Sequence, residues 1–306
     1  MKSKLAYLFP FFAIVLWSGN VIVSRLSART IGPEAITFYR LLLAVLLMST
    51  FVAVPAWRNR SVIWPHLGLF LILGFLAMCL FQSLSYLAAE TTTATNMAVI
   101  TALTPLLTVA LSAVLLNDTP TVGMVGGGIL SLVGLVYLIS AGDPAALVRD
   151  GVHLGDPLML LAAIVYALYG VLLKRWNLPV TGWQSTYMQA LCALVIMFPA
   201  FLATPAPMRA LNAETLPLIA YAGGLASVIL PFLWVRGVHI LGPNRCALFM
   251  YLLPVLTALA AIVLLGEPVR AYHVIGGGTA LAGVACAEIL RRPLRRSAAV
   301  RPDVVK

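Results

Sequence analysis

The side chains best suited to binding a ligand in this sequence lie inside long apolar stretches. Trp17, Asn20 and Ser24 follow one another at spacings of three and four residues, so they would share one face of a helix. An amide group in a bilayer is unfavourable unless it is hydrogen-bonded, so Asn20 is expected to face protein or water. Two simpler interpretations stay open: Asn20 only bonds two helices together, and Trp17 is an ordinary packed aromatic residue.

Other residues within apolar stretches extend this candidate site. Gln82 and Ser85 form a polar pair with Met78 on the same face, and Thr101 and Thr104 begin a stripe of hydroxyls. Hydroxyls in membrane helices often bond their own backbone, which is the alternative for this stripe. We predict the following substrate-binding set: Trp17, Asn20, Arg40, Met78, Gln82, Ser85, Tyr86, Thr101, Thr104, Tyr166, Tyr169, Trp234 and Tyr251.

Arg40 is the single basic residue well inside an apolar segment, about 10 Å from the end of a helix that begins at Pro33. Its guanidinium is suited to a substrate carboxylate. Equally open are an extension toward the nearer membrane surface and a bond to a backbone carbonyl. No Asp or Glu lies in the middle of an apolar segment, although proton-coupled transporters commonly relay protons through such carboxylates. The candidate site thus offers ring faces and neutral hydrogen-bonding groups, with one positive charge at its edge.

Signatures of catalysis and of nucleotide binding are absent from the sequence. His66, His153, His239 and His273 lie at segment ends without HExxH spacing, and no GxxxxGK[ST] loop is present to hold ATP phosphates. The four cysteines lie in apolar segments without metal-ligand spacing. We therefore expect no enzyme activity, no cofactor, no metal and no ATP.

The composition places the candidate residues in membrane-spanning helices. Hydrophobic residues make up 61% of the 306-residue chain and charged residues 10%, which is typical of a polytopic membrane protein. A helix of roughly 20 apolar residues crosses the hydrocarbon layer of a membrane. Among the expected helices, the sixth begins near residue 154, with Asp156 as its expected cap residue. The ten apolar segments, which leave no room for a soluble domain, are 5–24, 33–54, 64–88, 95–117, 122–141, 154–173, 183–203, 215–235, 245–265 and 272–290.

Membrane topology, and not nucleic-acid binding, explains the net charge of +10. If the amino terminus is cytoplasmic, five of the 20 Lys and Arg residues lie outside, Arg40 lies within a span, and the other 14 are cytoplasmic. This asymmetry follows the positive-inside rule, so both termini are predicted to be cytoplasmic. The external five are Arg25, Arg29, Arg149, Arg209 and Arg270.

One long apolar stretch occurs twice. Residues 95–118 recur at an offset of 149 as residues 244–267, with eight of 24 positions identical, Pro105 and Pro254 among them. A proline inside a helix frees the carbonyl four residues earlier, here that of Thr101 or Met250, and at membrane depth another group must satisfy it. A water-filled or substrate-filled cavity would do so, and both prolines are predicted hinges. The alternative is that Ser/Thr side chains or a neighbouring helix satisfy it and that the prolines only shape packing.

The same offset relates residues along most of the chain. Residues 1–143 and 150–291 are predicted to be two copies of a five-helix unit, with a basic tail at 292–306. Because five is odd, the second copy enters the membrane from the opposite side, so the repeat is inverted. Small residues four apart predict close helix packing; they are Gly123, Gly127 and Ser131, and Gly278, Ala282 and Cys286. Matching pairs include Trp17/Tyr166, Asn20/Tyr169, Thr37/Thr186, Arg40/Gln189 and Gly74/Gly223.

Several motifs together resemble a known family. Trp-Ser-Gly-Asn lies at 17–20, Leu-x-Pro-x-Leu-Thr occurs at 103–108 and 252–257, and Leu-Leu-x-Asp/Glu follows each. With two inverted sets of five helices over about residues 5–290, these features resemble EamA-type members of the drug/metabolite transporter superfamily, and within it most of all YddG-type exporters of aromatic and neutral amino acids. The resemblance implies a basket of ten helices around a central cavity lined mainly by helices 1, 3, 4, 6, 8 and 9, with helices 5 and 10 at the periphery.

The sequence thus predicts an all-α integral membrane protein of the bacterial inner membrane. We expect a secondary transporter that moves small neutral or zwitterionic metabolites, in particular amino acids including aromatic ones, by alternating access. Its expected partners are this small-molecule substrate and the lipid bilayer. A multidrug exporter or a lipid-linked sugar flippase of the same fold is the competing interpretation, although members of the family that export cationic drugs use a membrane glutamate that this chain lacks.

Overall fold

The protein is built from helices. The computed structural model describes residues 5–27, 30–92, 94–149, 153–265, 269–290 and 292–293, and these residues contain no β-strand. The helices are α2 (Leu8–Ser27), α3 (Pro33–Arg58), α4 (Arg60–Ile63), η1 (Trp64–His66), α5 (Leu67–Gly74), η2 (Phe75–Leu80), α6 (Phe81–Thr91), α7 (Ala94–Thr101), α8 (Thr104–Leu115), α9 (Val122–Ile139), α10 (Pro144–Arg149), α11 (Gly155–Trp176), α12 (Gly182–Ala203), η3 (Ala206–Arg209), α13 (Thr215–Ala220), η4 (Tyr221–Ile229), α14 (Leu230–Leu241), α15 (Pro243–Leu248), η5 (Phe249–Tyr251), α16 (Leu252–Leu265) and α17 (Ala271–Ile289).

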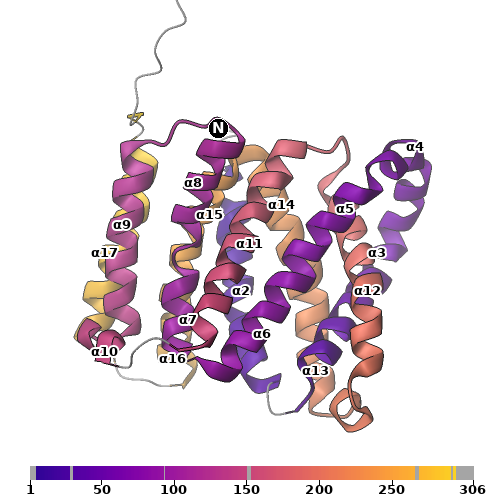
Figure 1. Ribbon diagram of the computed structural model, residues 1–306, viewed down its shortest axis with the longest axis horizontal. Helices are drawn as coiled ribbons and strands as arrows, with labels where there is room; N and C mark the ends of the chain where they lie inside the picture. Colours follow the sequence, from indigo (N-terminus) through magenta and orange to yellow (C-terminus); the bar gives the residue numbers. More distant parts are fainter. Residues whose placement is uncertain are drawn as a thin grey trace, which may run out of the picture.

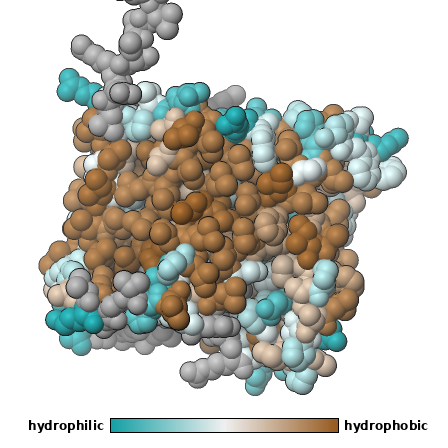
Figure 2. All heavy atoms as spheres, in the orientation of Figure 1, coloured by the Kyte–Doolittle hydropathy of each residue, from teal (hydrophilic) through white to brown (hydrophobic). Residues whose placement is uncertain are grey.

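An apolar belt covers the middle of the bundle. Among the described residues, seven helical stretches are long and apolar enough to cross a membrane, and Leu8–Asn20 is a shorter apolar helix. Figure 2 shows hydrophobic side chains across the middle of one face and hydrophilic ones toward its upper and lower edges. Val54, Val114 and Val195 are largely exposed, as expected where lipid replaces water around a helix. The chain is therefore a multi-pass membrane protein.

Successive helices cross the bundle in alternating directions (Figure 1). At the upper end of that view, the Tyr7 hydroxyl donates to Glu288 Oε2 at 2.8 Å, which joins the start of α2 to the end of α17. Asn59 Nδ2 donates to Gln184 Oε1 at 3.3 Å, which joins the end of α3 to the start of α12. The first and last described helices thus have their outer ends on the same side of the bundle.

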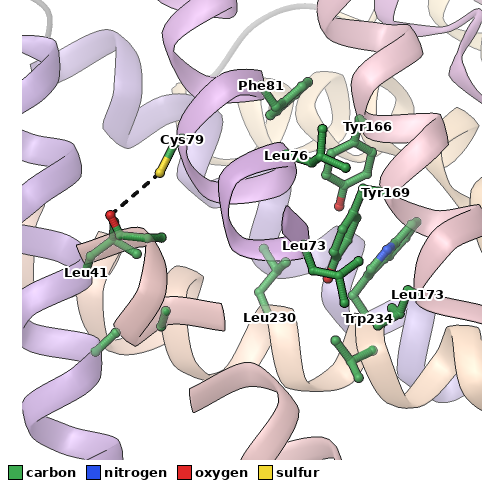
Figure 3. Close-up of a cluster of buried hydrophobic side chains, with 14 of the residues drawn as sticks. Leu41, Leu73, Leu76, Cys79, Phe81, Tyr166, Tyr169, Leu173, Leu230 and Trp234 are labelled. Carbon is green, nitrogen blue, oxygen red and sulfur yellow. Dashed lines mark hydrogen bonds between the residues drawn. The ribbon is translucent and has the colours of Figure 1, made fainter. Parts of the chain in front are cut away.

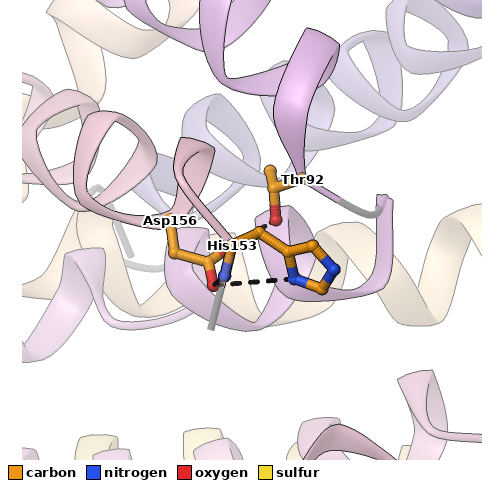
Figure 4. Close-up of polar contacts among 3 residues, drawn as sticks. All are labelled: Thr92, His153 and Asp156. Atoms are coloured by element: carbon orange, nitrogen blue, oxygen red, sulfur yellow. Dashed lines mark hydrogen bonds and ion pairs between the residues drawn. The ribbon is translucent and has the colours of Figure 1, made fainter. Parts of the chain in front are cut away.

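A polar contact joins α6 and α11 at the lower end (Figure 4). The Asp156 carboxylate accepts hydrogen bonds from the Thr92 hydroxyl and, at 2.9 Å, from the backbone N–H of His153. The prediction that Asp156 is the cap residue is wrong, because Leu154 is the cap and Asp156 lies in the first turn. Its side chain nevertheless satisfies an N–H at the helix start, where negative charge also complements the helix dipole.

Two helix contacts are built from residues that the sequence pairs at an offset of 149. A Cβ at Gly74 would lie 2.4 Å from the carbonyl oxygen of Gln189, and a Cβ at Gly223 would lie 3.1 Å from that of Arg40. Gly74 directly precedes η2 and Gly223 lies within η4; both segments are π-helical and end at positions 149 residues apart. The same local packing therefore occurs in both halves of the chain.

α9 and α17 lie side by side at one edge of the bundle (Figure 1). Ser131 Oγ donates to the carbonyl oxygen of Ala280 at 2.9 Å, and a Cβ at Gly127 would lie 2.4 Å from the carbonyl oxygen of Gly283. The two backbones can approach this closely only where side chains are absent. The close packing predicted from glycine spacing is confirmed for this face of α9.

The stripe predicted on the partner helix is wrong in part. Gly278 faces open space and Ala282 is exposed, whereas Gly276 and Gly283 each contact the α9 backbone. Ala280 and Ala287 are buried as well, so the packed face of α17 alternates steps of four and three residues. A strict spacing of four drifts around a helix of 3.6 residues per turn, which explains the error.

The helices that contain Pro105 and Pro254 are interrupted. α7 ends at Thr101 and α8 begins at Thr104, with Pro105 in its first turn, while α15, η5 and α16 follow one another around Pro254. The carbonyl oxygen of Thr101 accepts a hydrogen bond from Thr104 Oγ1 at 2.6 Å. A neighbouring hydroxyl, and not a cavity, therefore satisfies the carbonyl that Pro105 frees.

Candidate functional site: an aromatic cavity between the helices

A cavity lies between α2, α3, η2, α6, α11, η4 and α14. Its volume is about 80 Å³, several times the roughly 10–15 Å³ that a cavity needs to hold one water. The cavity can therefore hold a small ligand, whereas a larger one requires the walls to move. The lining residues are Trp17, Asn20, Thr37, Arg40, Leu41, Ala77, Met78, Phe81, Gln82, Tyr166, Tyr169, Ala226, Ser227, Leu230, Pro231 and Trp234.

Aromatic side chains from four helices form one wall of the cavity, and Figure 3 shows most of them. The Trp17 ring centroid is 5.2 Å from that of Tyr166 and 6.1 Å from that of Trp234. The Tyr166 centroid lies 4.9 Å from Phe81 and 5.7 Å from Tyr169. Most of these pairs are edge-to-face or tilted, which is the arrangement favoured by the ring quadrupole. Ring faces on this wall can in turn hold a ligand cation.

Two buried polar atoms in the lining have no partner. Within the described part of the chain, neither Asn20 Oδ1 nor Trp234 Nε1 makes a hydrogen bond, and both side chains are buried. An unsatisfied buried donor or acceptor costs about 1–3 kcal/mol, so two in one cavity call for an explanation. The amide oxygen accepts and the indole N–H donates. A ligand that carries both a donor and an acceptor would satisfy both atoms.

Arg40 supplies the positive charge of the lining. Its side chain is buried, its Nε donates to Ser227 Oγ at 2.8 Å, and its Nη2 donates to the carbonyl oxygen of Ala226 at 3.4 Å. The interpretation that this side chain extends to the membrane surface is therefore wrong, and a bond to a backbone carbonyl is confirmed. These contacts join α3 to η4 and hold a guanidinium at the cavity, where its planar fork suits a carboxylate.

The two π-helical segments line the cavity with matching residues. Ala77 and Met78 come from η2, and Ala226 and Ser227 come from η4 at the positions 149 residues later. A π-helical turn alters the regular backbone ladder, and such turns are frequent at functional sites. In η4 the Ala226 carbonyl accepts from the side chain of Arg40 on another helix.

The cavity brings together most of the predicted site. Its helices place Trp17 and Asn20 three residues apart on α2, and Tyr166 and Tyr169 three residues apart on α11, so each pair shares a face. The interpretation of Asn20 as a purely structural bond between helices gains no support, because its oxygen is unpartnered. The predicted residues found in the lining are Trp17, Asn20, Arg40, Met78, Gln82, Tyr166, Tyr169 and Trp234.

Several other predicted residues lie elsewhere. Ser85 Oγ donates to the carbonyl oxygen of Phe81 at 2.8 Å, and Thr101 Oγ1 donates to that of Met97 at 2.7 Å. Like Thr104, they bond the backbone of their own chain segment, which is the alternative expected of membrane hydroxyls. Tyr251 is fully buried in a separate cluster against α9. The side chain of Tyr86 lies outside the described residues.

The cavity uses a different set of helices from the one that the family resemblance implies. Among the described residues, helix 4 (α7 and α8) and helix 9 (α15, η5 and α16) contribute nothing to the lining, whereas α3, the second helix, contributes Thr37, Arg40 and Leu41. The peripheral helices α9 and α17 also contribute no described residue. Part of the reason is local: the hydroxyls of helix 4 are used within that helix.

Sequence reasoning missed four residues whose signals were present. Thr37 stands three residues before Arg40, and Phe81 three after Met78, so each shares a face with a predicted residue. Ser227 is the single serine of its apolar stretch, and Pro231 is a proline inside a span, like Pro105. Ala77, Ala226, Leu41 and Leu230 also line the cavity, and nothing in the sequence marks them.

One family model matches most of the chain, and the relatives found are named as transporters. The model of the EamA-like transporter family matches residues 4–140 and again residues 153–288. An uncharacterized transporter of Archaeoglobus fulgidus is 28% identical over 93% of this chain and 97% of its own, and the uncharacterized transporter YyaM of Bacillus subtilis is 26% identical over 88% and 90%. The uncharacterized inner membrane transporter YicL of Salmonella typhimurium is 22% identical over 83% and 85%. A protein solved by crystallography has the same fold, with a TM-score of 0.73 at 21% identity over 94% of this chain and 99% of that one.

Proposed function

This chain belongs to the EamA-like transporter family, and from that premise we propose that it is a secondary transporter for small zwitterionic metabolites, above all neutral amino acids including aromatic ones. The family and the transporter names of its relatives favour transport over catalysis. One observation carries the substrate class: a single lining holds an unpartnered acceptor on Asn20, an unpartnered donor on Trp234 and the guanidinium of Arg40.

Each end of a zwitterion has a complement in this lining. A substrate carboxylate accepts hydrogen bonds from the Trp234 indole N–H and from the Arg40 guanidinium. A substrate ammonium donates to Asn20 Oδ1 and lies against the ring faces of Trp17 and Tyr166. The Gln82 amide, which both donates and accepts, is available to either end.

The rest of the substrate meets apolar and aromatic surface. Apolar pockets discriminate weakly between similar side chains, so the range of amino acids is broad. The cavity is too small for a large side chain without movement of its walls. We propose that an aromatic substrate ring replaces some of the ring-to-ring contacts among Trp17, Tyr166 and Trp234, which makes that movement inexpensive.

Transport proceeds by alternating access between two inverted repeats, residues 1–143 and 150–291. The family model supports this division because its two matches begin 149 residues apart. The paired contacts of Gly74 and Gly223 and the two π-helical segments support it as well. In such folds one repeat rocks against the other around a central site, and Pro105 and Pro254 are proposed hinges.

Both termini are proposed to be cytoplasmic in a bacterial inner membrane, following the distribution of Lys and Arg. The meeting of α2 and α17 at one end of the bundle supports a common side for the two ends. Reporter fusions at Asp143 and after Lys306 test the assignment, with periplasmic and cytoplasmic signals expected in that order. The same side for both would overturn the inverted repeat.

The driving force is proposed to be the concentration gradient of the substrate. The described lining of the cavity contains no Asp or Glu to carry a proton. Transport then requires neither ATP nor a pH gradient.

The experiment is uptake of radiolabelled phenylalanine and methionine by proteoliposomes without ATP or an imposed pH gradient. Wild-type protein should equilibrate both, and Trp17→Ala and Gln82→Ala should each slow uptake. Ser85→Ala is the control, since Ser85 lies near Gln82 in the chain but bonds its own backbone. Strict dependence on a proton gradient contradicts the proposed energetics. Transport of cationic drugs or lipid-linked sugars, with no neutral amino acid moved, contradicts the proposed substrate.

A further inference from the structure

The cavity is lined by the start of α3 but not by the matching start of α12. It reaches Thr37 and Arg40, which lie four and seven residues after the start of α3, or about 6 and 10 Å from the lower end. The residues that match them at an offset of 149 are Thr186 and Gln189, which lie at the same depth from the start of α12 at the upper end. Neither of these two lines the cavity.

Thr186 and Gln189 form a buried polar cluster with Ser185. The side chains of Thr186 and Gln189 are fully buried, and Gln189 Nε2 donates to Ser185 Oγ at 2.9 Å. In the described part of the chain, Gln189 Oε1 and Thr186 Oγ1 have no hydrogen-bond partner. The matching residue Thr37, by contrast, donates to the carbonyl oxygen of Pro33 at 2.7 Å. Two acceptor atoms on one turn of helix thus lack a partner among the described residues, outside the lining of the cavity.

We infer that this cluster is the substrate site of the opposite conformation, the one in which the cavity opens toward the upper end. This inference rests on the proposed alternating access of two matched repeats. In the opposite conformation the second repeat adopts the arrangement that the first repeat has here. Thr186 and Gln189 then line the cavity as Thr37 and Arg40 do now. The two unsatisfied oxygens then acquire a partner from the substrate.

The chemistry of the cluster selects one end of the zwitterion. The free atom of Gln189 is an amide oxygen, which only accepts, and a hydroxyl accepts as well. They therefore bind the substrate ammonium, whereas Arg40 at the lower end binds the carboxylate.

Side-specific kinetics with Gln189→Met and Thr186→Val test the inference. Both substitutions keep approximate shape and remove an acceptor, so KM for phenylalanine offered at the upper end should rise about tenfold, as for loss of a hydrogen bond to a charged group. KM for phenylalanine offered at the lower end should stay within about twofold. Right-side-out and inside-out membrane vesicles give the two values. Val195→Ala is the control, because Val195 lies exposed on the same helix, outside the cluster, and it should change KM on neither side by more than about twofold.

The outcomes are separable. Because the Thr186 hydroxyl bonds to no described residue in this conformation, Thr186→Val should not lower Tm, and a KM shift with unchanged Tm excludes damage to the fold. If the wild type transports phenylalanine but both variants leave KM unchanged or raise it equally on the two sides, the inference is overturned and the proposed function stands. If the wild type moves no neutral amino acid, the proposed function fails and the inference fails with it.

Discussion

The α9–α17 pair and the cavity are built on opposite principles. In the pair, Gly127 and Gly283 bring two backbones into contact, and Ser131 closes the interface with a hydrogen bond to Ala280. In the cavity, bulky rings keep the helices apart, and the polar atoms of Asn20 and Trp234 stay unpartnered among the described residues. The pair has little space to rearrange, and the cavity has space as well as unsatisfied groups.

This difference matters for a protein that must change shape. Tightly packed helices switch between discrete arrangements and do not deform continuously, so they transmit movement as rigid units. A cavity with unpartnered groups is a region of lower stability, where a ligand can shift the balance between conformations. We therefore expect substitutions in the pair to damage folding and substitutions in the cavity to damage transport.

Gly127→Leu should have the largest effect, and on stability. A Cβ at this position would lie 2.4 Å from the backbone oxygen of Gly283, so the helices must separate, which costs about 3 kcal/mol or more because overpacking is unfavourable and buried contacts are lost. Thermal unfolding of purified protein in detergent measures the loss. Gly126→Leu is the control, since Gly126 is exposed and a Cβ there meets nothing within 4 Å. Equal Tm values for the two variants would show that the pair is not tightly packed.

The sequence predicts the pair better than the cavity, and the reason is physical. Small residues repeated near helical spacing have one main use in a membrane helix, which is close packing, and only the register on α17, at Gly278 and Ala282, was wrong. Which residues line the cavity depends on which helices lie at the centre of the bundle and which face each of them turns inward. That is why the family resemblance did not imply α3, although Arg40 on it was predicted, and why the hydroxyl of Thr104, used within its own helix, was expected there.

Arg40→Met should reduce transport strongly with a smaller effect on folding. Loss of charge-assisted hydrogen bonds of about 1.5–3 kcal/mol corresponds to a fall of roughly 10- to 150-fold in kcat/KM for phenylalanine. Arg40→Lys should recover part of it, because an ammonium keeps the charge but loses the planar fork. Uptake assays on both variants, normalised to the folded protein, give the comparison. Normal uptake by Arg40→Met would remove the carboxylate site from the proposal.

Trp234→Phe should have a moderate effect confined to transport. The substitution keeps an aromatic ring and removes an N–H that has no partner in the described structure, so Tm should change little. Loss of one substrate hydrogen bond of about 1 kcal/mol should raise KM about fivefold. Trp183→Phe is the control, since Trp183 stacks on Phe232 at 3.9 Å outside the cavity. A KM shift of the same size in both variants would show that the effect comes from packing.

Pro105→Ala should have the smallest effect and the most specific one. The new N–H at position 105 can bond the carbonyl oxygen of Thr101, which now accepts from Thr104 Oγ1 at 2.6 Å, so α7 and α8 can join into one stiffer helix. Transport should slow about fivefold if bending here is part of the cycle, while KM and Tm stay near wild type, because the residue does not line the cavity. Pro199→Ala, at an exposed proline within α12, should leave the rate unchanged. A wild-type rate for Pro105→Ala would assign this proline to helix packing alone and would move the search for a hinge to Pro231, the proline that does line the cavity.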